Sequence, residues 1–314
     1  MGTALVTGGT GFVGRELVRQ LVARGDQVAV LSRSRPAAKV YWLECDFTDS
    51  VALEKTISNN KFDVIYHCGS LPGDTGNPDE MVRVNVVGLT NMLEVARRMK
   101  VKRFVLSSSI SAYEWYPATK FRPPVRMPVS EDHPCRPQDI YSSSKRMQEL
   151  LIETYFHQYE LPTCALRLTA VVGPGGRGGG KMWREFAEQM QAGNQIQLPM
   201  FSAEELAHFV DLRDVAEMHI CCGEHVNAIG QIFNCCGPKP TRGSEFASYV
   251  EGICPGAKAT FGFPWSMAQG GEISFDMAKI KSLLHYEPTH SLEDSVTSIY
   301  DWVQAGGLEG STSE

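Results

Sequence analysis

The sequence lacks three patterns that would place it in other classes of protein. Its nine cysteines show no paired C-x-x-C spacing and no cysteine–histidine array of the kind that holds zinc. Lysine and arginine are scattered, and the formal net charge is −6, so no basic stripe is available to a phosphate backbone. No apolar run is long enough to span a bilayer. We therefore expect reduced thiols, no metal site, no nucleic-acid partner and no membrane span.

The first residues also lack a targeting signal. Thr3 to Thr7 reads as a core strand, which leaves no room before it for a basic segment, an apolar segment and a cleavage site. The Met-Gly start does not match a myristoylation signal, because Val6 stands where Ser or Thr is required. These absences predict a cytoplasmic protein.

The first half of the chain shows a regular alternation. Short β-branched runs alternate with amphipathic helical stretches, which predicts right-handed βαβ units and an α/β fold with a Rossmann-type doubly wound parallel sheet. The predicted strands cover residues 4–7, 27–31, 40–43, 63–67, 103–107 and 163–168. The first predicted helix of this half begins at Phe12, and two further helices are predicted over residues 78–99 and 139–158.

A glycine motif joins the first predicted strand to the first helix. Gly8, Gly11 and Gly14 form G-x-x-G-x-x-G, which permits a tight turn, close approach of a pyrophosphate and close packing of the helix on the strand. The unpaired amides at the helix N-terminus favour an anion. The motif therefore predicts a dinucleotide site, whereas an isolated motif would be equally compatible with an ordinary turn.

The end of the second predicted strand indicates which dinucleotide is preferred. It reads Ser32-Arg33-Ser34-Arg35 and has no carboxylate to bind the ribose 2′-hydroxyl of NAD. Arg33 or Arg35 can pair with a 2′-phosphate, so NADP is favoured over NAD, unless both are solvated surface charges. Asp46-Phe47 after the third strand is placed to meet the adenine, or Asp46 caps the helix that follows.

Beyond Leu168 the pattern changes to a glycine-rich stretch at residues 173–180 and then to shorter elements. This change predicts a smaller C-terminal substrate-binding lobe. The expected division is an NAD(P)-binding domain over 1–168, to which 208–235 returns, a lobe over 169–207 and 236–305, and a flexible tail over 306–314. Helices of this half are predicted at 181–191, 211–223, 244–252, 276–284 and 292–303.

A catalytic pair is suggested by Tyr141 and Lys145, which lie at i and i+4 and so share one face of a predicted helix. An ammonium near a phenol favours the phenolate and lowers its pKa toward neutrality. Such a pair also arises by chance. Ser107 to Ser109 end a strand at the carboxyl edge of the sheet, where ligands of α/β sheets bind, and Ser109 can polarise a substrate oxygen; a polar strand end is the alternative.

With these residues in place, the chain resembles the extended short-chain dehydrogenase/reductase family, which includes nucleotide-sugar epimerases and dehydratases. The resemblance covers nearly the whole chain. It rests on Thr7–Gly14, Asp46, His67–Gly69, Asn85–Asn91, Ser107–Ser109, Tyr141–Lys145, Leu166–Leu168, Val172–Gly175 and Phe209–Ala216.

The resemblance implies that Ser109, Tyr141 and Lys145 are a catalytic triad, and that Thr169 and Val172 contact nicotinamide. It also implies a homodimer through the helices near 78–99 and 139–158. The full set of expected cofactor contacts is Gly8, Thr10, Gly11, Phe12, Val13, Gly14, Ser32, Arg33, Arg35, Asp46, Phe47, Cys68, Gly69, Ser70, Asn85, Ser107, Tyr141, Lys145, Thr169 and Val172.

The chain also departs from the pattern of the family it resembles. Cys68-Gly69 stands where two alanines are usual, and Leu168-Thr169 lacks a usual proline. Sugar-nucleotide members of the family carry two arginines that clamp the substrate diphosphate. The corresponding places read Leu206-Ala207-His208 and Ser266-Met267-Ala268-Gln269, so a diphosphate would lose its charge-assisted partners.

The missing arginines favour an NAD(P)-dependent alcohol dehydrogenase or carbonyl reductase that acts on a small hydroxyl or carbonyl substrate with Tyr141 as acid and base. One alternative is a nucleotide-sugar epimerase or dehydratase, and another is a non-catalytic cofactor sensor. Expected substrate contacts are Ser109, Tyr113, Arg177 and Trp183; the two aromatic residues are otherwise core.

Overall fold

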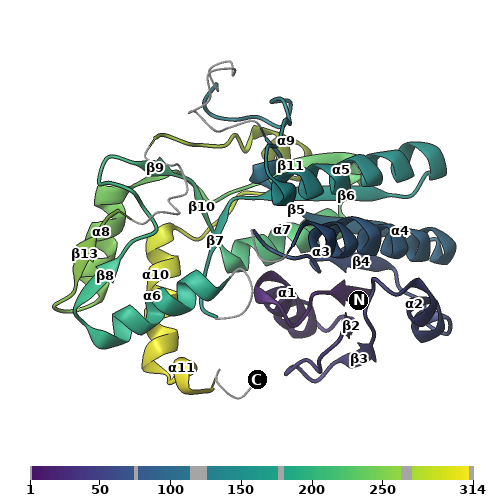
Figure 1. The fold of residues 1–314 in the computed structure, drawn as a ribbon, viewed down its shortest axis with the longest axis horizontal. Helices are drawn as coiled ribbons and strands as arrows, with labels where there is room; N and C mark the ends of the chain where they lie inside the picture. The colour runs from purple at the N-terminus through teal and green to yellow at the C-terminus, as the bar shows by residue number, and fades with distance from the viewer. Residues whose placement is uncertain (1, 74–76, 114–125, 176–179, 263–270, 311–314) are drawn as a thin grey trace.

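A seven-stranded sheet forms the larger body of the computed structural model, which describes residues 2–73, 77–113, 126–175, 180–262 and 271–310 (Figure 1). The strand order is β11-β6-β5-β4-β1-β2-β3, and every neighbouring pair is parallel. The strands are β1 (Thr3–Thr7), β2 (Gln27–Ser32), β3 (Tyr41–Glu44), β4 (Val64–His67), β5 (Arg103–Ser109), β6 (Thr163–Leu168) and β11 (Gln231–Cys235). This order confirms the predicted Rossmann-type doubly wound α/β fold.

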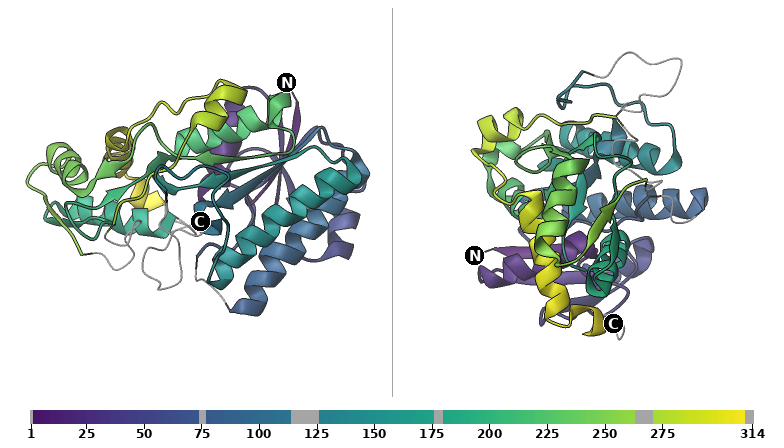
Figure 2. Two further views of the ribbon diagram at one scale, coloured as in Figure 1. Left: turned by 90° about the horizontal axis from the view of Figure 1, so that it is seen from above. Right: turned by 90° about the vertical axis from the view of Figure 1, so that its left-hand side faces the viewer.

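Helices cover both faces of the sheet, as the nearly continuous apolar strands require. On one face, α1 (Phe12–Ala23) and α7 (Leu212–Glu224) bury residues such as Leu17 and Met218 against Val6 of β1. On the other face, α2 (Ser50–Ile57), α4 (Gly88–Met99) and α5 (Ile140–Tyr159) pack on a second core that includes Leu5 and Ile152. In Figure 2, α4 and α5 run side by side over this face.

The predicted helix over 78–99 contains a change of pitch. It consists of α3 (Pro78–Val82), a π-helical turn η1 (Arg83–Val87) and α4. Asn77 caps its start by accepting a hydrogen bond from the Glu80 amide at 2.7 Å, and Pro78 at the first helical position needs no partner for its nitrogen. π turns inside α-helices are frequent at functional sites, and this one contains Asn85.

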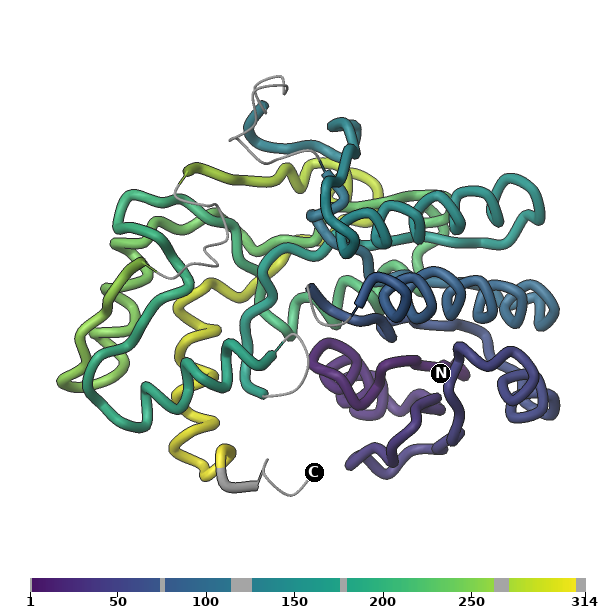
Figure 3. The backbone as a smooth tube through the Cα atoms, in the orientation of Figure 1, coloured from purple at the N-terminus to yellow at the C-terminus, as the bar shows by residue number. Residues whose placement is uncertain are grey.

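The smaller body packs around an aromatic core of Trp183, Phe186 and Phe246. Its helices α6 (Lys181–Ala192), α8 (Gly243–Ile253) and α10 (Leu292–Gln304) lie together at one side of the sheet (Figure 3). Three short two-stranded sheets complete it. They are β7 (Ala170–Val172) with β10 (Phe209–Asp211), β8 (Gln195–Gln197) with β13 (Lys258–Thr260), and β9 (Leu206–Ala207) with β12 (Thr241–Arg242).

The chain passes between the two bodies more than once. After β6 the chain enters the smaller body, and it later returns to form β11, which pairs with β6 from Gln231↔Cys164 to Cys235↔Leu168. The remaining elements are η2 (Ile110–Ala112), η4 (Val226–Ala228), α9 (Ala278–Leu284) and α11 (Gly307–Gly310). Because Leu308 is buried in the core of the smaller body, the expected flexible tail is helical over its described first part.

No helix in the described part of the chain combines the length and the apolar character needed to cross a membrane.

Candidate active site

The glycine turn forms a cradle at the carboxyl end of β1. Gly8 has φ +67°, a backbone conformation that favours glycine. A Cβ on Gly14 would lie 2.2 Å from the Gly8 carbonyl oxygen, and one on Gly8 would lie 2.7 Å from the Gly69 nitrogen. Gly11 caps α1 without a side-chain hydrogen bond, so the helix N-terminus is open to an anion. These residues fit the pyrophosphate of a dinucleotide.

One cleft of about 1110 Å³ extends from this cradle to the ends of β4, β5 and β6 and to the smaller body. It brings together most of the residues predicted to contact cofactor or substrate. They are Gly8, Thr10, Gly11, Phe12, Val13, Gly14, Ser32, Arg33, Asp46, Phe47, Cys68, Gly69, Ser70, Ser107, Ser109, Tyr141, Lys145, Thr169 and Trp183.

Three predicted cofactor contacts do not line this cleft. Arg35 points elsewhere, with its guanidinium 5.9 Å from the centre of the Trp42 ring. Val172 is fully buried, and its strand neighbour Val171 lines the cleft instead. Successive residues of a strand face opposite sides, so the prediction was off by one position.

Asn85 is the third correction, because it braces the site and does not line it. Its side-chain oxygen accepts a hydrogen bond from the Leu71 amide at 2.8 Å, and its side-chain nitrogen donates to the Leu71 carbonyl at 3.2 Å. The same nitrogen donates to the Ser144 hydroxyl at 3.0 Å. The π turn thus ties the loop after β4 to α5.

The predicted substrate contacts have different outcomes. Tyr113 is wrong as a cleft residue: it is fully buried and donates to the Asn234 side chain at 2.7 Å. Trp183 lines the cleft but is almost entirely buried, with its indole nitrogen donating to the Val171 carbonyl at 2.6 Å. Arg177 lies outside the described residues.

Tyr141 lies in the first turn of α5 beside Ser109 at the end of β5. β5 is longer than predicted, since Ser107 to Ser109 pair with Leu166 to Leu168 of β6. Burial raises the pKa of Tyr141, and the hydrogen bond with Ser109 offsets this only in part. The expected lowering of this pKa by Lys145 is not seen in this structure, where the ammonium lies 5.9 Å from the centre of the Tyr141 ring.

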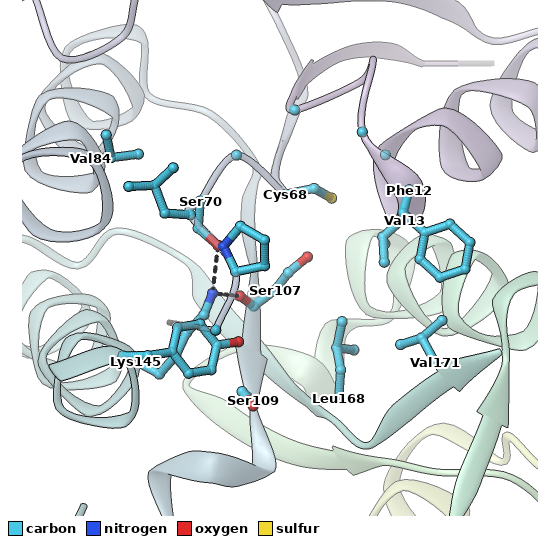
Figure 4. A pocket seen from close by; sticks show the side chains of 18 of the residues that line it. Phe12, Val13, Cys68, Ser70, Val84, Ser107, Ser109, Lys145, Leu168 and Val171 are labelled. Atoms are coloured by element: carbon cyan, nitrogen blue, oxygen red, sulfur yellow. Dashed lines mark hydrogen bonds between the residues drawn. The ribbon is translucent and has the colours of Figure 1, made fainter. Parts of the chain in front are cut away.

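The Lys145 ammonium is instead fixed by two oxygens (Figure 4). It donates to the Ser70 hydroxyl at 2.9 Å and to the Ser107 carbonyl at 3.0 Å. Burial lowers the pKa of Lys145 to about 8, against the opposing influence of Cys68 and Glu149. Ser107 is itself fixed, because its hydroxyl lies 2.7 Å from Nε2 of buried His219 on α7.

A buried ion pair joins β5 and α5, which carry Ser109, Tyr141 and Lys145, to the neighbouring strand β6. Glu149 of α5 accepts hydrogen bonds from Arg167 Nε at 2.8 Å and Nη2 at 2.9 Å, and from the Ser108 hydroxyl at 2.7 Å. The Arg167 guanidinium also lies 4.3 Å from the centre of the Tyr113 ring. The pair therefore fixes the ends of β5 and β6 against α5, one helical turn after Lys145.

The structure describes one of the two positions at which an arginine would bind the diphosphate of a sugar nucleotide and this chain has none. Ala207 is fully buried in β9. The ring of His208 is held at both nitrogens, with Nε2 3.0 Å from the Gly237 carbonyl and Nδ1 accepting from the Phe275 amide at 3.1 Å. Burial lowers the pKa of His208 to about 4, so it brings no charge at neutral pH. The second position lies outside the described residues.

Sequence reasoning missed several residues that line the cleft. They are Leu71, Pro72, Gly73, Ile110, Ser111, Ala170, Met182 and Phe201. Phe201 has 58 % of its surface exposed, which is unusual for a phenylalanine. Its sequence neighbourhood contains no periodic pattern, so only its exposure in the folded chain separates it from a core residue. Within the described ranges, no group of three or more His, Cys, Asp or Glu side chains is arranged to hold a metal.

Comparison with known proteins gives a consistent result. The family model described as the NAD dependent epimerase/dehydratase family matches residues 4–236. The UDP-glucuronate 4-epimerase of Thermodesulfobacterium geofontis is 26% identical over 96% of both chains. Two solved structures share the fold at 22% identity. An epimerase of Methanothermobacter thermautotrophicus has a TM-score of 0.84 over 99% of this chain and 95% of its own. UDP-glucuronic acid 4-epimerase from Bacillus cereus, in complex with NAD, has a TM-score of 0.79 over 96% and 99%.

Proposed function

The chain belongs to the NAD-dependent epimerase/dehydratase family, in the extended short-chain dehydrogenase/reductase group, and we propose that it epimerises a nucleotide-linked sugar at a hydroxyl-bearing carbon. The observation that carries the proposal is the single cleft in which the dinucleotide cradle meets Ser109, Tyr141 and Lys145. A relative named as a UDP-sugar 4-epimerase, aligned over nearly the whole chain, supports this substrate class over the reductase that the sequence favoured.

The residues of the cleft have distinct tasks in this reaction. A bound nicotinamide would take a hydride from the sugar carbon and return it to the opposite face. Tyr141 reacts as the phenolate, which accepts the proton of the sugar hydroxyl and later gives it back. Ser109 hydrogen-bonds the same oxygen and orients it toward Tyr141. Lys145 presents a positive charge that stabilises the phenolate as Tyr141 loses its proton.

A carbonyl reductase is the second candidate, and one observation favours it. The first clamp position offers buried Ala207 and neutral His208, so a diphosphate would find no cation there. Burying two negative charges without a partner is costly. An uncharged carbonyl substrate makes no such demand.

The two candidates differ in a direct assay. We expect purified protein with NAD to interconvert one member of a panel of UDP-hexoses and UDP-hexuronates, followed by ¹H NMR of the sugar protons. Tyr141→Phe should lower turnover by about 10² to 10⁴-fold, because the proton acceptor is lost. NAD affinity should change less than about twofold by calorimetry.

The control is Tyr159→Phe, at the far end of the same helix, where the half-exposed ring stacks with Arg97; it should remain fully active. If no UDP-sugar reacts while NADPH reduces some ketone or aldehyde, the reductase is the correct function. Turnover of Tyr141→Phe near that of the unchanged protein would refute the role of this residue in both.

We further propose that the protein accepts NADP at least as well as NAD. Arg33 is exposed and lines the cleft at the end of β2, where Ser32 donates to the Ser34 carbonyl at 2.7 Å. Burial alone would raise the pKa of nearby Asp46, yet hydrogen bonds from Thr48 and the charges of Arg33 and Arg83 lower it. Arg33 and Asp46 both line this end of the cleft, so a dinucleotide bound there would meet one charge of each sign.

Arg33→Ala should weaken NADP binding by about 10-fold or more while leaving NAD nearly unchanged, since a hydrogen bond to a charged group contributes roughly 1.5–3 kcal/mol. Calorimetric titration with each dinucleotide measures both. Arg35→Ala is the matched control, because Arg35 does not line the cleft. Equal affinity of the unchanged protein and Arg33→Ala for NADP would show that Arg33 is a solvated surface charge.

We also propose that the protein forms a homodimer and resides in the cytoplasm. Val82 and Val87 on the α3–η1 segment and Met147 and Leu150 on α5 are exposed apolar residues, which fits a homodimer through these helices. Light scattering of the purified protein measures the mass of the assembly. All nine cysteines are free thiols, which fits a reducing compartment such as the cytoplasm.

A further inference from the structure

We propose that Ser70 is a positioning residue for Lys145: its hydroxyl fixes the lysine ammonium at the point where the cofactor ribose and Tyr141 meet. The inference deepens the proposed function and rests on it for the role of Lys145. It concerns a residue that the sequence predicted only as one of many cofactor contacts.

The geometry at Lys145 leaves little freedom. Two of its three N–H groups are occupied, by the Ser70 hydroxyl at 2.9 Å and the Ser107 carbonyl at 3.0 Å. Ser70 lies in the loop that follows β4, and Ser107 lies near the end of β5, the strand with which β4 is paired. The third N–H is directed by the other two, because the ammonium is tetrahedral. In Figure 4 both bonds meet at the ammonium inside the cleft.

Ser70 is itself held from both sides. The residue after it, Leu71, is bonded through its amide and carbonyl to the Asn85 side chain. Before it, Gly69 packs so closely that a Cβ would lie 2.8 Å from Phe47. Asn85 in turn donates to Ser144 of α5, the residue before Lys145. The loop that carries Ser70 is therefore braced against the helix that carries its partner.

The protonation states of the groups around Lys145 explain why the Ser70 hydroxyl matters for the charge of the ammonium. Burial lowers the pKa of His67 to about 3 and raises the pKa of Cys68 to about 11, so both are neutral at pH 7. In the cofactor-free protein Tyr141 is likewise a neutral phenol, because burial raises its pKa. Glu149, the carboxylate that acts on Lys145 from one turn along α5, is already bonded to Arg167. Among the described residues, Ser70 supplies the one side-chain hydrogen bond to the ammonium.

Loss of the hydroxyl should therefore destabilise the charged form of a lysine whose pKa burial already lowers to about 8. The experiment is a ¹³C NMR pH titration of lysine Cε in the full-length, cofactor-free protein, with the Lys145 signal identified by its absence in Lys145→Arg. Ser70→Ala should lower the pKa of Lys145 by about one unit, the effect of one charge-assisted hydrogen bond. Ser70→Thr, which keeps the hydroxyl, should restore it.

Ser248→Ala is the control, since the Ser248 hydroxyl is exposed on α8 and donates to the Ser244 carbonyl of its own helix; it should leave the pKa of Lys145 unchanged. A second readout is the pH at which NAD affinity falls, which should move down with the same lysine in Ser70→Ala. An unchanged lysine titration in Ser70→Ala, or a shift that Ser70→Thr shares, overturns the proposal. The titration uses no substrate, so its result is independent of whether the protein epimerises sugars.

Discussion

The buried ion pair between Glu149 and Arg167 allows a quantitative test of what holds β5, β6 and α5 together. Glu149 is completely buried and Arg167 is 3 % exposed, so neither charge can be solvated by water if its partner is removed. In Glu149→Ala the Arg167 guanidinium would lose two hydrogen bonds, the Ser108 hydroxyl would lose its acceptor, and Arg146 would lose one hydrogen bond. The arginine would remain charged, because its pKa lies far above neutral pH.

The expected loss in the free energy of unfolding follows from the burial of both partners. Removing one member of a buried ion pair destabilises a protein by about 3–5 kcal/mol, whereas replacing both by apolar residues of similar size is often neutral. We therefore expect Glu149→Ala to lower the free energy of unfolding by about 3–5 kcal/mol. The double variant Glu149→Leu/Arg167→Met should be more stable than Glu149→Ala alone.

Urea unfolding followed by circular dichroism measures these differences. The control is Glu287→Ala, which removes the exposed ion pair between Glu287 and Lys281 and should cost less than about 1 kcal/mol. The reasoning is refuted if Glu149→Ala is no more costly than Glu287→Ala, or if the double variant is less stable than Glu149→Ala.

Two further predictions concern β1 and the glycine turn. Hydrogen bonds from the Thr3 amide, Lys102 and the Thr3 hydroxyl hold the pKa of Asp63 at about 2. This value lies below the pKa of about 3.9 that Asp63 has in the unfolded chain. The contribution of the Asp63 carboxylate to stability is therefore complete above about pH 4 and is lost as the pH falls toward 2. The stability difference between the unchanged protein and Asp63→Asn should accordingly be smaller at pH 3 than at pH 6 in urea unfolding. Gly14→Ala, whose Cβ would lie 2.2 Å from the Gly8 oxygen, should weaken NAD binding at least about 10-fold and lower stability, because a contact that close forces the turn apart. Gly252→Ala in α8, where a Cβ meets nothing within 4 Å, should bind NAD normally and be slightly more stable.

The sequence predicted the sheet and the meeting of Ser109, Tyr141 and Lys145 in one cleft, because both depend on local patterns. Alternating apolar runs determine the strands, and the i,i+4 spacing alone places Tyr141 and Lys145 on one face of α5. Ser109 joins them since the carboxyl ends of parallel strands share one edge of the sheet. These features need no knowledge of which side chains meet across long stretches of chain.

The residues that were wrongly predicted depend on such distant contacts. Tyr113 is drawn into the core by an acceptor on Asn234, far along the chain. Asn85 faces the loop after β4 because a π turn shifts its direction by a fraction of a helical turn. The partner of Lys145 is likewise a residue 75 positions away. Periodicity fixes where an element lies, whereas such pairings appear only after the elements pack.

The late return of β11 has a consequence for how the protein is made. β6 is complete at Leu168, but its neighbour begins at Gln231, so at about 5–20 residues per second the ribosome leaves this strand edge unpaired for roughly 3–12 seconds. An apolar edge with free backbone groups is a template for pairing with another chain. This edge therefore stays unpaired for as long as residues 169–230 take to be synthesised, and an insertion in that segment would lengthen the time during which the nascent chain can aggregate.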